Sequence, residues 1–304
     1  NAAVFQEGNE NEATQMIEGN ENAAYTNQDG SYNSAYVEQS GSNNMVVQDQ
    51  DVYNPLASPY DESGEAERND SWVKQVGENN EVYSTQFGDG NTNEIAQMGS
   101  NNQAWVNQGL KDQYHSNANL AEYWVQGDNN KFWGTQKGDE NLMSFDLKTY
   151  NDGSNNGNEI HADQVGMGNS MKVAVKGDNN TTFDFDQEGN YNKIRGLGEA
   201  AYFFYEGDQA EDFTISQKGN HNVVEGKIRH GAYIDLNVQQ NGNYNYSSLD
   251  IKDWNNTVDI DQTAVGVSGM SNRNEATVYQ RGGMQNATVN QHGAGNDANI
   301  SQTP

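Results

Sequence analysis

The sequence predicts an all-β fold, a parallel β-solenoid whose two sheets stack face to face in a cross-β arrangement. The text Gln-x-Gly-x-x-Asn-x-φ-x-φ-x, in which φ is a small or apolar residue, recurs every eleven residues in the first copies of the 304-residue chain. Between the corners, small or apolar residues alternate with polar ones, which is the period of a half-buried strand. A short fixed period means that one structural unit is stacked many times.

Each strand is predicted to follow the motif Asn and to face inward at every second residue. One copy runs from Asn102 through Ala104 and Val106 to Gln108. The intervening residues are polar or mixed, and we expect them on the outer face. At the corner, both the Gly two residues after Gln and the motif Asn are expected to take the left-handed backbone that a tight reversal requires.

The motif Gln is predicted to be buried, because the residues that replace it in degenerate copies are all uncharged, in a chain with 20% charged residues. These replacements are Ile17, Val125, Leu147, Val175, Tyr205, Ile228 and Ile251. We therefore expect a thin interior of Ala, Val and Ile with rows of amides, each of which can bond to the identical amide above and below it.

The residues predicted to build these ladders recur in phase along the chain. The ladder glutamines are Gln6, Gln28, Gln39, Gln50, Gln75, Gln86, Gln97, Gln108, Gln262, Gln280, Gln291 and Gln302. The ladder asparagines are Asn11, Asn22, Asn33, Asn44, Asn80, Asn91 and Asn102. The turn glycines are Gly8, Gly19, Gly30, Gly41, Gly77, Gly88 and Gly99.

Two arcs that face each other make one rung, so alternate copies are expected in opposite sheets. Gln6, Gln28 and Gln50 should share one column, while Ile17 and Gln39 should share the other. About twelve rungs of two 11-residue arcs, spaced by about 4.8 Å, predict a rod of roughly 57 Å with two sheets about 10 Å apart. The whole chain, residues 1–304, is expected to form one solenoid.

The repeat is interrupted at several places, which we predict to be surface loops because the same pattern resumes after each. The interruptions lie near 52–66, 109–117, 148–157, 229–233 and 263–272. Pro55 and Pro59 fall inside the first of them, where a missing amide hydrogen removes no ladder bond. The segment from Thr182 to Asp212 matches the repeat least well, and Phe183, one residue out of step, suggests a β-bulge.

Composition excludes several classes of protein. Hydrophobic residues make up only 33% and the net charge is −28, which is typical of disorder, but the phased apolar positions, 10% aromatic content and 3 Pro argue for a fold. A pI near 4.2 argues against nucleic acid. No stretch approaches the roughly 20 apolar residues of a membrane span. There is no Cys, and because no leader precedes the pattern at Asn1, we expect a processed chain.

No residue pattern predicts catalysis, a cofactor or a metal site, so we expect no enzyme. The corners at Gly88–Asn91, 127–130 and 177–180 contain Gly, Asp and Asn but lack calcium-loop spacing, and turn chemistry explains them. Alternating carboxylates on one strand are expected to be a solvated face. They are Asp184, Asp186 and Glu188.

The remaining candidate residues are ring-bearing side chains. The five histidines have no paired zinc-type spacing, and we expect them in solvent. They are His115, His161, His221, His230 and His292. Tyr83 and Trp105 stand 22 residues apart on the outward set, so they should pack across neighbouring strands. Contact with a surface, a dye or a sugar is the alternative use of such a pair.

The two ends of the chain are predicted to be uncapped strands. Val4 and Gln6 begin strand text almost at once, and Ile300 and Gln302 continue it almost to the end. Unpaired edge strands are templates for pairing with another copy. We therefore expect end-to-end self-association into a filament. The alternative is a monomeric solenoid adhesin, or a minor nucleating or decorating subunit, that binds through its inserted loops.

The text Gln-x-Gly-x-x-Asn-x-Ala-x-x-x-Gln resembles the curlin repeat of curli fibre subunits over nearly the whole chain. It occurs at 97–108 and again at 291–302. The resemblance implies a secreted cross-β subunit of an extracellular functional amyloid in a biofilm matrix, with a role in cell adhesion. It further implies a nucleator subunit, a secretion channel and chaperones as partners. The chain is longer than typical family members and often lacks the motif Gln, which leaves the choice between a major and a minor subunit open.

Overall fold

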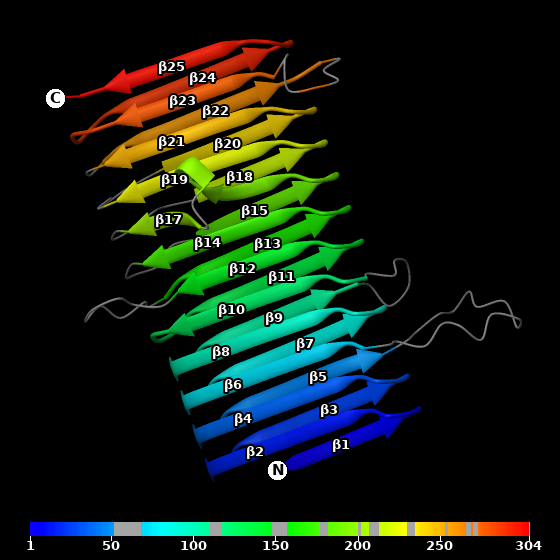
Figure 1. Ribbon diagram of the computed structural model, residues 1–304. Coiled ribbons are helices and arrows are strands. Elements are labelled where there is room, and N and C mark those ends of the chain that lie inside the picture. Colours follow the sequence, from blue (N-terminus) through cyan, green and yellow to red (C-terminus); the bar gives the residue numbers. More distant parts are fainter. Residues whose placement is uncertain are drawn as a thin grey trace, which may run out of the picture.

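The computed structural model is an all-β rod of two parallel sheets, which confirms the predicted fold (Figure 1). It describes residues 1–51, 68–109, 117–147, 157–176, 182–199, 202–206, 213–229, 235–252, 255–265, 269 and 273–303. Successive strands alternate between the sheets, so each strand pairs with a strand two steps away along the chain. The termini lie at opposite ends of the rod.

The first sheet contains twelve strands. They are β1 (Ala2–Glu7), β3 (Ala23–Asp29), β5 (Met45–Asp51), β7 (Glu81–Phe87), β9 (Gln103–Gln108), β11 (Lys131–Lys137), β13 (Glu159–Val165), β15 (Thr182–Glu188), β18 (Phe213–Lys218), β20 (Asp235–Asn241), β22 (Thr257–Thr263) and β24 (Asn286–His292).

The second sheet contains β2 (Glu12–Asn20), β4 (Ser34–Ser42), β6 (Asp70–Glu78), β8 (Thr92–Ser100), β10 (Leu120–Gln126), β12 (Leu142–Leu147), β14 (Ser170–Lys176), β16 (Lys193–Gly196), β19 (Val223–Arg229), β21 (Tyr246–Lys252), β23 (Glu275–Gln280) and β25 (Asp297–Gln302), with β17 (Phe203–Glu206) off this path. Both β16 and β17 pair with β14 and with β19, so the two short strands share one rung. The single 3-10 turn η1 (Leu197–Glu199) follows β16. The rod therefore has about twelve rungs, as the period predicts.

The register keeps identical positions above one another. Gln6 pairs with Gln28, and Gln28 with Gln50, while Ile17 pairs with Gln39 in the opposite sheet. The expected bulge at Phe183 is wrong, because β15 pairs with β13 without a break from Thr182 to Glu188.

The corners are built from two left-handed positions, and one of them differs from the prediction. The motif glycines do have positive φ, from 97° at Gly8 to 125° at Gly77. The motif Asn does not. The residue immediately before it does, as at Glu10 (54°), Tyr32 (61°) and Ala118 (54°). The Asn side chain is instead directed into the ladder, where its amide needs an ordinary backbone to reach its partners.

Glycine is required at the motif position by the close approach of neighbouring rungs as well as by φ. A Cβ on Gly77 would overlap the carbonyl oxygen of Gly99 in the next rung and lie 2.8 Å from its carbonyl carbon. The same overlap recurs between Gly41 and Gly77. The other left-handed position makes no such backbone contact: a Cβ on Gly90 would meet nothing closer than 3.9 Å, and one on Gly168 would meet only the Tyr191 ring, at 2.6 Å.

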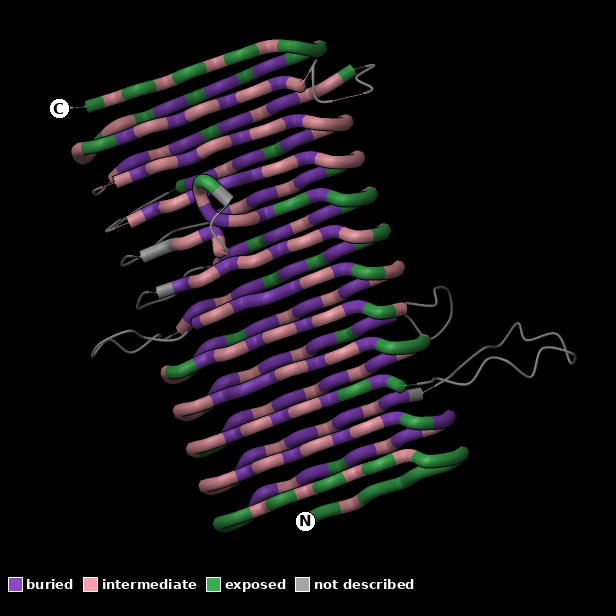
Figure 2. The backbone as a smooth tube through the Cα atoms, viewed as in Figure 1, coloured by how far each residue is buried: buried purple, intermediate pink, exposed green. Residues whose placement is uncertain are grey.

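The inward faces form one continuous core (Figure 2). The expectation of a thin Ala, Val and Ile interior is correct near the ends of the rod and wrong in its middle. There the largest fully buried side chains are aromatic, namely Tyr123, Phe132, Phe145, Phe183, Phe185, Phe203 and Phe213. Phe203 fits because its neighbour in the adjacent rung of the same sheet is Gly226, where a Cβ would overlap the ring.

Most of the predicted loop residues lie outside the described residues, namely all of 52–66 and most of 109–117, 148–157, 229–233 and 263–272. The side chain of Tyr205 lies outside them as well. Two boundaries of these predicted loops are wrong by a residue or more, since Arg229 ends β19 and Thr263 ends β22. On both sides of each gap the strands continue the same two sheets.

Candidate assembly surface

An unbroken column of twelve glutamines runs through the first sheet from end to end. In each rung the Nε2 of one Gln donates to the Oε1 of the next, beginning with Gln6 to Gln28 at 2.7 Å and ending with Gln262 to Gln291 at 2.8 Å. The intermediate bonds measure 2.8–3.0 Å. All of these donors face the same direction along the rod.

Five members of this column are absent from the set predicted from the sequence. They are Gln136, Gln164, Gln187, Gln217 and Gln240. The first two stand six residues after Asn130 and Asn158, so the Asn-to-Gln spacing would have identified them. The other three have no Asn at that spacing, but each begins the text Gln-x-Gly-x-x-Asn, so the motif itself would have identified them, and the strand register places them in the column.

The second sheet carries only short runs of the same ladder. Gln39, Gln75 and Gln97 are linked at 2.9 and 3.0 Å, and Gln280 donates to Gln302 at 2.8 Å. Between the runs stand the apolar replacements, and Val125, Leu147, Val175, Ile228 and Ile251 are all fully buried. Each run begins with an acceptor that has no partner among the described residues, the Oε1 of Gln39 and of Gln280.

Two asparagine columns line the corners. The backbone N–H of an Asn, and in many rungs its side-chain N–H as well, donates to the Oδ1 of the Asn one rung earlier, as from Asn44 to Asn22 at 2.9 and 3.1 Å. The second column includes Asn11, Asn33 and Asn91. Asn Nδ2 also donates to the glycine carbonyl of the next rung, for example from Asn80 to Gly99 at 2.8 Å. Ordered corners therefore depend on the Gly and the Asn together.

Both ends of the rod are open edges in the described chain (Figure 2). Val4 belongs to the interior column but is 42% exposed, and its neighbour Phe5 is 57% exposed. Gln6 is exposed, and Ile300 and Gln302 are half-buried, because no further rung covers them. The first sheet ends in β24 and the second in β25.

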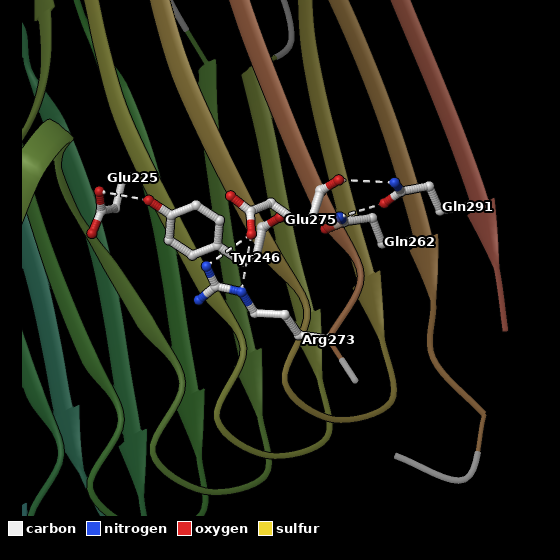
Figure 3. Close-up of polar contacts among 6 residues, drawn as sticks. All are labelled: Glu225, Tyr246, Gln262, Arg273, Glu275 and Gln291. Carbon is white, nitrogen blue, oxygen red and sulfur yellow. Dashed lines mark hydrogen bonds and ion pairs between the residues drawn. The ribbon is translucent and has the colours of Figure 1, made fainter. Parts of the chain in front are cut away.

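The two ends differ in what they offer to a hydrogen-bonding partner. Among the described residues no group donates to the Gln6 Oε1, which faces away from the rod. At the other end, Gln291 Nε2 donates to the Glu275 carbonyl at 2.8 Å and has no further Gln to reach (Figure 3). One end therefore presents an amide acceptor and the other an amide donor.

The outward aromatic side chains pack on one another. The rings of Tyr83 and Trp105 stack with centroids 5.9 Å apart, and the stack continues through Trp133 at 5.1 Å to His161 at 4.6 Å. His221 lies between two tyrosine rings at 5.3 and 4.9 Å. His292 is exposed, as expected, while His115 and His230 lie outside the described residues. The expected cross-strand packing of Tyr83 and Trp105 is therefore present.

The acidic residues form no metal site in the described part of the chain, where no group of three or more such ligands converges. Asp184, Asp186 and Glu188 project outward from β15, and burial is the main factor that raises the pKa of Asp186. The Asp128 carboxylate accepts the Ser100 N–H at 2.7 Å, so it serves the turn. The corner at 177–180 lies outside the described residues.

The model of the curlin associated repeat matches two stretches of the chain, residues 19–50 and 272–303. These stretches cover the end of β2 through β5, and β23 through β25. No curated protein matches the chain. No helix among the described residues is long and apolar enough to cross a membrane.

Proposed function

Because this chain is a curlin-repeat protein, we propose that it is a structural subunit that assembles end to end into an extracellular, curli-like amyloid fibre. The curlin family consists of structural amyloid subunits of such fibres. By the same relation we propose a biofilm matrix as its setting, and a nucleator, a secretion channel and chaperones as its partners.

The observation that carries the proposal is that the two open ends match each other. Continuing the register by one rung places β1 of a second copy on β24, and β2 on β25. In the first sheet this sets Val4 against Val289 and Gln6 against Gln291. The interior columns then continue across the junction with apolar on apolar and amide on amide.

The direction of the ladder makes the junction head to tail. The Gln291 Nε2 of one copy would donate to the Gln6 Oε1 of the next, which repeats the bond made eleven times within the chain. Head-to-head contact would set two donors or two acceptors against each other. An interface of this kind does not close on itself, so copies add without limit.

The test is seeded elongation of the variant Val4→Asp, followed by thioflavin fluorescence and electron microscopy. The carboxylate would be buried against Val289 of the preceding copy, which costs several kcal/mol without a partner. In the isolated subunit the same position is largely exposed, so the fold should survive. We expect the variant to stop growth at one filament end.

The matched control is Asn299→Asp, on the exposed outer face of β25, which should elongate like the wild type. Equal elongation of Val4→Asp and wild type would contradict the proposed junction. Wild-type chain that stays monomeric at every concentration, even with seeds, would instead favour the monomeric adhesin.

A further inference from the structure

The outer face of the first sheet is strongly acidic over β13 to β22. Eight carboxylates project from it, and the basic Lys218 is bonded to one of them, Glu188, at 3.5 Å. The carboxylates are Glu159, Asp163, Asp184, Asp186, Glu188, Asp235, Asp259 and Asp261. We call this surface the acidic face.

The opposite side of the same rungs is basic, although the chain as a whole has a net charge of −28. On the outer face of the second sheet, from β14 to β21, the described basic side chains are Lys172, Lys193, Arg195, Lys227, Arg229 and Lys252. The acidic ones are Glu225 and Asp250. We call this surface the basic face.

Most cations of the basic face have no counter-ion among the described residues. Glu225 is only 4% exposed, and it is bound by Arg195 at 2.5–2.8 Å and by the Tyr246 hydroxyl at 3.0 Å. Beside it, Arg273 lies over the Tyr246 ring and bonds to Glu275 at 2.8 Å (Figure 3). Glu225 and Glu275 are therefore engaged, while Asp250 lies opposite Lys227 in the register and forms no ion pair among the described residues.

Five cations form no ion pair within the described chain, namely Lys172, Lys193, Lys227, Arg229 and Lys252. Two of them, Arg229 and Lys252, are direct cross-strand neighbours, an arrangement that is unfavourable without an anion. Although the chain has 44 acidic residues, none of the described ones forms an ion pair with these five cations. An external anionic surface is the complement that it lacks.

We propose that filaments of this protein associate side by side, with the basic face of one copy against the acidic face of a second copy. The inference rests on the proposed filament. The two faces lie on opposite sides of one rod and share the same rung spacing of about 4.8 Å, so translation without rotation brings them together. Such a contact is heterologous and gives stacked filaments of one polarity.

Charge also makes this contact selective. Two acidic faces repel each other, so only the unlike pair is attractive. Each exposed ion pair is weak, but the band recurs once per subunit along the filament, and many weak contacts act together. The turn η1 packs against β19 and β21, so the basic face is not flat, and the long Lys and Arg side chains must span the remaining distance.

The test compares two triple variants by electron microscopy and light scattering. Lys193→Glu with Lys227→Glu and Lys252→Glu makes both faces acidic. Asp184→Lys with Asp235→Lys and Asp259→Lys removes nearly all the net negative charge of the acidic face, so that it no longer complements the basic face. We expect each variant alone to form single filaments, with at least a tenfold loss of bundled material, and an equal mixture of preformed filaments to bundle again. Wild-type bundles should separate in about 0.5 M salt, where screening is strong.

Thioflavin fluorescence measures filament elongation separately from bundling. If the wild type elongates but forms only single filaments, the lateral contact is overturned while the proposed filament stands. Undiminished bundling of either triple variant, or a mixture that stays unbundled, would also overturn the lateral contact. If wild type bundles only after a polyuronate or duplex DNA is added, the basic face binds a polyanion instead. If no filaments form, the same proteins are compared by sedimentation velocity, where absence of salt-sensitive pairing rejects the proposal.

Discussion

The glycine columns provide the sharpest test of how closely the rungs pack. Replacing Gly77 by Ala places a Cβ against the backbone of Gly99, in a column where every neighbour makes the same approach. The obstruction is main chain, so no side chain can rotate away from it. The only relief is to separate two rungs, which stretches the Asn and Gln bonds on either side.

The expected magnitude follows from two contributions. A φ of 125° is a region that L-residues rarely adopt, and it costs about 1–3 kcal/mol. Displaced rungs add weakened hydrogen bonds of about 1 kcal/mol each. The loss should therefore exceed about 3 kcal/mol, which places Gly77→Ala among the most severe single substitutions.

The control is Gly90→Ala, because that corner also has positive φ (64°) but has open space, and the equivalent position one rung later is Ala118. It should lose about 1 kcal/mol or less, since a left-handed Ala costs about 1–2 kcal/mol and a less flexible unfolded chain offsets part of that. Urea unfolding of the unassembled subunit measures both. Similar losses for the two variants would refute the close-approach explanation.

Three further substitutions test the interior and the surface. Val106→Asp buries a charge and should lower the unfolding free energy by several kcal/mol and block assembly, while the exposed Asn107→Asp should leave both unchanged in urea titrations and thioflavin assays. Tyr123→Phe should raise the unfolding free energy by about 1 kcal/mol, because the buried hydroxyl has no partner among the described residues; a loss of stability would indicate a hidden bond. Burial, and after it the neighbouring carboxylates, raise the pKa of Glu94, so the folded state binds the proton of this group more tightly than the unfolded state does. The free energy of unfolding should therefore fall as pH rises above about 4.5. Glu94→Gln should make that fall smaller when unfolding is measured across pH 4–7.

The period was sufficient to predict the fold, because stacking gives every copy of a residue the same surroundings. Gln6, Gln28 and Gln50 are equivalent for that reason, and the alternation alone assigns Val106 inward and Asn107 outward. The left-handed residue before the motif Asn was not predictable from residue type, since Tyr32 and Glu10 occupy it. Its conformation is imposed by the Asn ladder and not by local preference.

The middle of the rod was the least predictable part. The repeat is one residue longer before Phe183, and from the sequence alone such an insertion predicts a bulge within the strand. The structure instead pairs β15 with β13 without a break. The opposite charges of the acidic face and the basic face were also difficult to predict from the sequence. Consecutive strands belong to different sheets, so residues of the two faces alternate along the chain.

The graded size of the interior side chains has a consequence for joining. Terminal strands carry small residues inside, Ala2 and Val4 at one end and Ala287 and Val289 at the other, whereas the wide rings occur only between them. A middle rung always contacts its own chain and is free to enlarge. A terminal rung must pack against the terminal rung of another copy, so the space between the sheets has to be equally narrow at both ends of the rod.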